Sequence, residues 1–190
     1  MGSRSWRRER EWQRNFVASI DRPIASIVIA TSKPDKDWFP ERWAEVSDSL
    51  IRDFGMEVVL VGGMSERELA AQRIVMERAK HKPRSRLGSG LRNLVSILDA
   101  SALVLSPDTG PLHMSVALNR PVISLMGYTN PKRTGPYRRF HDLIIDAYGD
   151  PGEHYPISME NRPGRMTRIE PQHVLEKVQL WTQRYRGVIR

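Results

Sequence analysis

The segment SPDTGPLHMSVALNRPVISLMG, residues Ser106–Gly127, places a short polar turn between two apolar runs and decides the fold. The preceding run ALVLS (102–106) and the closing run VISLM (122–126) are typical of buried strands. Between them, Leu112, Val116 and Ala117 share one face of a predicted helix. A strand, a turn, a helix and a strand within about thirty residues form the unit that builds parallel sheets. The turn lies at the carboxyl end of a strand, where open α/β sheets bind ligands.

The rest of the chain repeats this alternation of strand and helix. Apolar runs predict strands over 24–32, 57–63 and 143–146, and helical spacing predicts helices over 40–54, 65–79, 90–101 and 171–185. In the helix over 90–101, Leu91, Leu94, Val95 and Leu98 are expected on one buried face, and residues 80–89 are expected to form a basic loop. The fold class is therefore α/β, a Rossmann-like, doubly wound, mostly parallel sheet.

Length and composition indicate one soluble domain. The 190 residues are 39% hydrophobic, no apolar run approaches the ~20 residues of a membrane span, and the basic start carries no secretory signal. Cysteine is absent, which excludes disulfides and is compatible with the cytoplasm. We expect a basic N-terminal arm or linker helix over 1–22, a Rossmann-like domain over 23–170 and a C-terminal helix over 171–190.

The net charge of +8 and the pI of about 10.2 favour a polyanionic partner. Because no helix-turn-helix, zinc-finger or aromatic RNA-binding motif accompanies the charge, nucleic acid is not the expected partner. The charge gathers in two clusters. They are Arg4, Arg7, Arg8, Arg10 and Arg14, and then Lys132, Arg133, Arg138 and Arg139.

The loop after the first strand offers polar groups to an anion. Thr31 and Ser32 carry hydroxyl donors, and Lys36 carries a positive charge. The same residues are also compatible with an ordinary polar loop.

The loop after the second strand, GGMSERE, indicates a ribose contact. Gly62 and Gly63 allow a ligand to approach the backbone, and Glu66 or Glu68 can accept hydrogen bonds from ribose hydroxyls. Glu68 also stands three residues after Ser65, the capping-box spacing, so a structural role explains it nearly as well.

The loop SPDTGPLH has the chemistry of an anion site. Gly110 lacks the Cβ that would obstruct a phosphate, and the amides after Thr109 open a helix whose dipole favours negative charge. His113 lies in the first helical turn. The alternative is that Asp108 or Thr109 only caps the helix. Together the three loops predict a site for a nucleoside diphosphate.

The same segments resemble glycosyltransferase family 9, the lipopolysaccharide heptosyltransferases. The resemblance runs from about Ile24 to Pro136 and rests on Lys36-x-Trp38, on Asp108-Thr109-Gly110-x-x-His113 and on Gly127-x-Thr129-x-Pro131. It implies the C-terminal, donor-binding half of a GT-B fold. The expected reaction is inverting transfer of heptose from ADP-heptose to the lipopolysaccharide inner core, without a catalytic metal or another cofactor.

The resemblance also implies residue roles. Lys36, Thr31 and Ser32 would contact the donor's phosphates or sugar, and Glu66 or Glu68 the ribose. Asp108 would meet the sugar hydroxyls, Thr109 and Gly110 the diphosphate, and His113 would support that loop. The family's catalytic base lies in the acceptor-binding half, which these 190 residues do not match, so the catalytic residue is unknown.

The sequence is also compatible with two other functions. The chain is compatible with a non-catalytic nucleotide-binding module or with a GT-B-like enzyme that uses a UDP-sugar. The acceptor, lipid A–Kdo, is expected to bind through the N-terminal domain that is not matched here. Lys132, Arg133, Arg138 and Arg139 are candidates for the acceptor's anionic groups, and Arg4 to Arg14 for peripheral contact with the anionic inner membrane from the cytoplasm.

Overall fold

The computed structural model describes residues 3–187 and contains one six-stranded sheet. Residues 1–2 and 188–190, the outer ends of the predicted arm and C-terminal helix, lie outside the described residues. The sheet order is β3-β2-β1-β4-β5-β6, and every pair of neighbours is parallel. The strands are β1 (Ile24–Val28), β2 (Glu57–Val61), β3 (Arg84–Ser85), β4 (Leu103–Pro107), β5 (Val122–Met126) and β6 (Ile144–Asp146). This is the Rossmann order, so the predicted fold class is confirmed.

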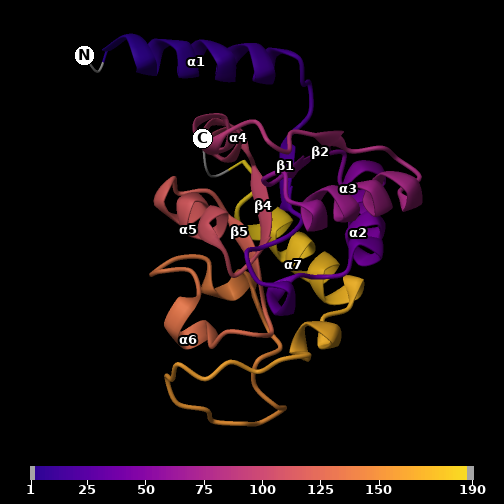
Figure 1. Ribbon diagram of the computed structural model, residues 1–190, viewed down its shortest axis with the longest axis vertical. Helices are drawn as coiled ribbons and strands as arrows, with labels where there is room; N and C mark the ends of the chain where they lie inside the picture. Colours follow the sequence, from indigo (N-terminus) through magenta and orange to yellow (C-terminus); the bar gives the residue numbers. More distant parts are fainter. Residues whose placement is uncertain (1–2, 188–190) are drawn as a thin grey trace.

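Helices cover both faces of the sheet (Figure 1). Helices α2 (Pro40–Arg52), α3 (Glu66–Arg78) and α7 (Pro171–Arg184) pack on one face, and α4 (Leu91–Ala100) and α5 (Gly110–Ala117) on the other. The short elements are α6 (Pro131–Thr134) and the 3-10 helices Pro34–Lys36, His141–Leu143 and Arg165–Arg168. With helices on both faces, all residues of β1, β4 and β5 are buried, which explains why these strands are apolar without alternation.

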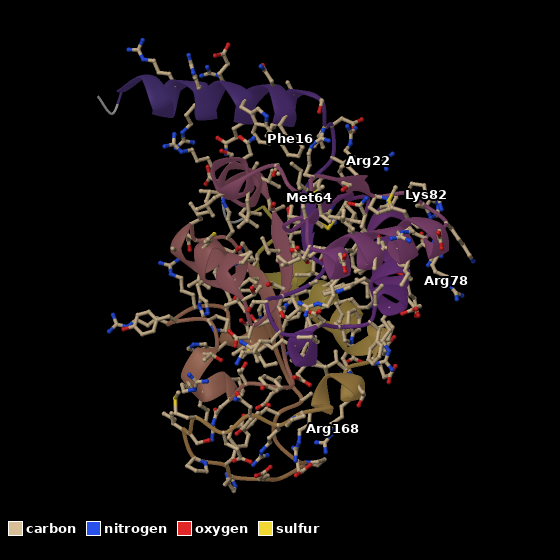
Figure 2. All side chains as sticks on the ribbon, in the orientation of Figure 1. Phe16, Arg22, Met64, Arg78, Lys82 and Arg168 are labelled. Carbon is tan, nitrogen blue, oxygen red and sulfur yellow. The ribbon has the colours of Figure 1, made fainter. Side chains whose placement is uncertain are left out.

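The N-terminal helix α1 (Ser3–Ala18) packs across α4 on its outer side. Phe16 is only 5% exposed and lies on the side of α1 that faces α4 (Figure 2). Nε2 of Gln13 donates to the carbonyl of Ser96 at 3.0 Å and to Oδ2 of Asp99 at 2.9 Å. Packing and hydrogen bonds therefore fix α1 to the domain. None of the helices in residues 3–187 combines the length and apolar character needed to span a bilayer.

Three details differ from the expectation from sequence. The first strand ends at Val28 rather than Ser32, because the amide of Thr31 is held by Oδ1 of Asp37 at 2.6 Å instead of by a neighbouring strand. The basic loop over 80–89 contains a short edge strand, β3, which pairs with β2. Leu91 was expected in the core but is 63% exposed, and Ile97 is buried in α4 instead.

Candidate functional site

The carboxyl ends of β1 and β4 meet at the centre of the sheet, where the chain changes face. In this fold that switch point is where ligands bind. Nζ of Lys36, from the loop after β1, lies 2.7 Å from Oδ2 of Asp108, which follows β4. Oγ1 of Thr129, after β5, donates to the same oxygen at 2.6 Å. The fold thus brings Lys36, Asp108 and Thr129 together from three separate loops.

The Asp108 carboxylate is ionised and well supported. Burial alone would raise the pKa of Asp108, but its contacts with His113, Lys36 and Thr129 outweigh burial and hold that pKa well below its ordinary range. Nε2 of His113 lies 3.6 Å from Oδ1, and half of the His113 side chain is exposed. A carboxylate held in this way remains a hydrogen-bond acceptor at all physiological pH values.

Trp38 explains how Lys36 is positioned. Its indole is buried, with Nε1 donating to the carbonyl of Ile169 at 2.9 Å and the ring at 4.5 Å from that of Trp43, edge to face. The pair Lys36-x-Trp38 is thus one anchored loop, in which the tryptophan fixes the backbone and the lysine points to Asp108.

The first turn of α5 is not capped by a side chain. Thr109 has an extended backbone at the N-cap and makes no side-chain capping hydrogen bond, and the Asp108 carboxylate faces Lys36 and Thr129. Capping therefore does not account for either residue. A Cβ added to Gly110 would meet only Cε of Met114, at 3.8 Å, so packing within the chain does not require glycine here.

A cavity of about 590 Å³ opens beside this turn, along the carboxyl ends of β1 and β2. Thr109 and Pro111 form its wall at α5, and Leu91 and Leu94 form an apolar wall at α4. Its other lining residues are Val28, Ala30, Thr31, Ser32, Gly62, Gly63, Ser65, Arg67, Glu68, Gly88 and Gly90. The cavity therefore combines polar groups near the switch point with an apolar end near α4.

The two glutamates proposed for the ribose differ in position. Glu68 lines the cavity, whereas Glu66 is exposed and does not. The predicted capping box is confirmed by two reciprocal hydrogen bonds. The amide of Ser65 donates to the Glu68 carboxylate at 2.9 Å, and the backbone amide of Glu68 donates to Oγ of Ser65 at 3.3 Å. The carboxylate also accepts from the amide of Gly63 at 2.5 Å. Although burial acts to raise the pKa of Glu68, the Ser65 and Gly63 hydrogen bonds lower it overall.

Thr31 and Ser32 both line the cavity, but the two side chains differ in their hydrogen bonds and exposure. Oγ1 of Thr31 donates to the carbonyl of Lys33 at 2.7 Å, so this hydroxyl stabilises its own loop. Ser32 is exposed. Arg67 lines this side of the cavity, and Asp37, which does not line it, contacts both Arg67 and the amide of Thr31. Sequence reasoning missed both residues, because their contacts join segments that are distant along the chain. It also missed the contact of Thr129 with Asp108, although the motif Gly127-x-Thr129-x-Pro131 carried a signal for it.

The second basic cluster divides into two parts. Lys132, Arg133 and Arg138 line a separate cavity of about 640 Å³ beyond the end of β5, together with Tyr137 and His141. Arg139 instead donates to Oδ1 of Asn119 and does not line that cavity. Of the first cluster, Arg7, Arg8 and Arg14 are exposed on α1, and the side chain of Arg4 lies outside the described ones.

Metal ligation has no candidate in the described part of the chain. Across residues 3–187, no three His, Asp or Glu side chains gather as a group that could hold an ion.

Comparison with known proteins finds heptosyltransferases. The profile of Glycosyltransferase family 9 (heptosyltransferase) matches residues 4–156. Lipopolysaccharide core heptosyltransferase OpsX of Haemophilus influenzae is 33% identical over 119 residues, which are 62% of this chain and 34% of the relative. Lipopolysaccharide heptosyltransferase 2 of Escherichia coli is 29% identical over 174 residues, 86% of this chain and 48% of the relative. The chain thus spans about half or less of the length of these relatives.

Solved structures agree with the fold. ADP-heptose lps heptosyltransferase II of E. coli superposes with a TM-score of 0.73 at 25% identity, covering 94% of this chain and 52% of that chain. A family 9 glycosyl transferase from Veillonella parvula gives a TM-score of 0.76 at 22% identity, over 91% of this chain and 51% of that chain. In each case one Rossmann-like unit matches half of the larger protein. The family profile covers most of the chain, so this protein belongs to glycosyltransferase family 9, the heptosyltransferase family.

Proposed function

We propose that residues 23–170 form the donor-binding domain of a heptosyltransferase of lipopolysaccharide core synthesis, with ADP-heptose as donor. The observation that carries this proposal is the Lys36–Asp108 pair at the switch point, beside a cavity of about 590 Å³. Small-molecule and cofactor sites in proteins have volumes of about 300–1,000 Å³, so the cavity is within the usual range. The names of the relatives support the donor, since one solved structure is titled an ADP-heptose heptosyltransferase.

In this proposal each part of the donor meets a different wall of the cavity. The base packs against Leu91 and Leu94, and the ribose hydroxyls donate to Glu68 rather than to the exposed Glu66. The diphosphate lies at the uncapped amides after Thr109, where Gly110 permits close approach and the helix dipole favours negative charge. Thr31 and Ser32 line the same cavity as Thr109 and are proposed to contact the diphosphate as well.

Asp108 accepts hydrogen bonds from the sugar hydroxyls, held in place by Lys36, Thr129 and His113. Lys36 and the amides of α5 supply positive potential to the diphosphate as it leaves, which is the electrostatic stabilisation that inverting transfer without a metal requires. The catalytic base and the lipid A–Kdo site are proposed to belong to an acceptor-binding half outside these 190 residues.

The basic residues fit the acceptor side of the same proposal. Lys132, Arg133 and Arg138 line the cavity of about 640 Å³ beyond the end of β5, where they would meet anionic groups of the acceptor. The exposed arginines of α1 would face an anionic membrane from the cytoplasm. We do not propose nucleic acid as a partner.

Calorimetric titration with ADP and UDP tests the proposal. We expect ADP to bind in preference to UDP, and Lys36→Ala to weaken ADP binding about tenfold, because it removes a positive charge at the diphosphate end. Asp108→Ala should weaken binding of ADP-heptose more than binding of ADP, because its carboxylate is assigned to the sugar hydroxyls. Asp35→Ala, in the exposed part of the same loop, is the matched control and should bind like the wild type. A preference for UDP would favour a UDP-sugar enzyme instead, and equal binding by all variants would remove the site assignment.

A further inference from the structure

Arg67 is a cation of the cavity that neither the sequence motifs nor the proposed donor contacts use. It lies in the first turn of α3, lines the 590 Å³ cavity and keeps 40% of its side chain exposed. Nη2 donates to the carbonyl of Thr31 at 2.5 Å, across 36 positions of the chain. The guanidinium therefore reaches from the loop after β2 to the loop after β1.

The remaining nitrogen atoms of Arg67 are poorly satisfied. Within residues 3–187, the buried Nε makes no hydrogen bond, although Oδ2 of Asp37 lies 3.3 Å away, and Nη1 has no acceptor. Oδ1 of Asp37 is engaged by the amide of Thr31 at 2.6 Å. Nε is buried and has only the ion pair with Asp37, whereas Nη1 is not among the buried atoms and has its donor capacity left for a ligand.

The residues around Arg67 indicate which kind of ligand its Nη1 would bind. Arg67 lies between Thr31, on the side of the proposed diphosphate, and Glu68, on the side of the proposed ribose. A guanidinium presents its N–H groups in a planar fork that matches phosphate oxygens. Lys36, the other cation nearby, is paired with Asp108 at 2.7 Å and does not line the cavity, whereas Arg67 does.

We infer that Arg67 is a phosphate ligand of the donor, contacting the diphosphate through Nη1, which has no acceptor among the described residues. Asp37 and the Thr31 carbonyl orient the guanidinium and so join the two loops into one binding surface. This inference rests on the proposed function, because it assumes that the cavity holds a nucleoside diphosphate.

A purely structural role for Arg67 makes a different prediction. If Arg67 only tied the two loops together, its loss would distort the whole cavity, and every ligand that binds there would lose affinity to the same extent. If Arg67 contacts phosphate, the loss grows with the number of phosphates on the ligand.

The test is calorimetric titration of adenosine, AMP and ADP into the wild type, Arg67→Ala, Arg67→Lys and Arg73→Ala. Arg73 is an exposed arginine of the same helix and is the matched control. We expect Arg67→Ala to weaken ADP roughly tenfold to hundredfold, the range for hydrogen bonds to charged groups, and to leave adenosine within about twofold. Arg67→Lys should recover part of the ADP affinity, and Arg73→Ala should change nothing.

The outcomes separate this inference from the proposal on which it rests. Equal loss of adenosine and ADP affinity in Arg67→Ala, or an ADP affinity equal to that of the wild type, would overturn the phosphate role while leaving the donor site in place. A wild type that binds neither ADP nor adenosine would overturn the proposed function itself, and the role of Arg67 with it. Thermal unfolding of each variant shows whether a loss of binding reflects a loss of folding.

Discussion

Nζ of Lys36 and Oδ2 of Asp108 lie 2.7 Å apart although 72 positions of sequence separate the two residues. The pair lies where β1 and β4 are adjacent, and 17% of the lysine and 8% of the aspartate side chain are exposed. An ion pair that is this deeply buried is costly to break, because either partner alone leaves an unpaired charge with little access to water.

Asp108→Asn should therefore destabilise the chain by about 3 kcal/mol, the cost of leaving the Lys36 charge buried without its partner. Urea denaturation measures the change. The double variant Lys36→Met, Asp108→Asn removes both charges and should recover a large part of the loss. Strictly additive effects of the two single substitutions would contradict a direct interaction.

The stabilisation by Asp108 should depend on pH. Because the pKa of Asp108 is lower in the folded chain than its ordinary value of about 4, this carboxylate stabilises the fold above that pH and loses the effect as the pH falls toward its folded value. The difference in unfolding free energy between wild type and Asp108→Asn should be constant from pH 7 to about pH 5 and shrink as urea denaturation is repeated at about pH 4 and below. A difference that stays constant below pH 4 would contradict the lowered pKa.

Glu68 and Glu66 should differ in how they affect recognition of the ribose. Wild type should prefer ADP to 2′-deoxy-ADP by about tenfold, the effect of one hydrogen bond to a charged acceptor. Glu68→Gln should lose most of that preference, because Glu68 lines the cavity, and Glu66→Gln, at an exposed position, should keep it. The opposite pattern would show that Glu66 reads the ribose.

Gly110→Ala should weaken ADP binding without lowering the stability of the fold. A Cβ at this position meets only Cε of Met114, at 3.8 Å, so thermal unfolding should show no loss and up to about 1 kcal/mol of gain from the reduced freedom of the unfolded chain. Binding of ADP should weaken, because we propose that the diphosphate lies at the amides after Thr109, and a methyl group at Gly110 would hinder its close approach to them. A variant that binds ADP as tightly as wild type would place the phosphates elsewhere.

Much of the fold could be predicted because local pattern and global topology agree. The run Ser106–Gly127 contains β4, α5 and β5, and their apolar segments follow directly from burial on both faces of a parallel sheet. Strand β3 escaped prediction because Arg84 and Ser85 are polar and owe their conformation to pairing with β2 at the edge of the sheet.

Site residues could be predicted from the sequence where they follow a strand. Site residues whose role depends on a contact between distant segments could not. Lys36 and Asp108 could be named because each stands just beyond a predicted strand end in a motif. Arg67 could not, because its significance depends on where the Thr31 carbonyl lies in three dimensions. Glu68 had two predicted roles, and the structure shows the capping role directly while also placing the residue in the cavity.

A crystal structure of this chain with bound ADP tests the central claim most directly. We predict the diphosphate at the amides after Thr109 with Arg67 against it, the ribose at Glu68 and the adenine packed against Leu91 and Leu94. ADP bound elsewhere, for example in the cavity lined by Arg133 and Arg138, would contradict it.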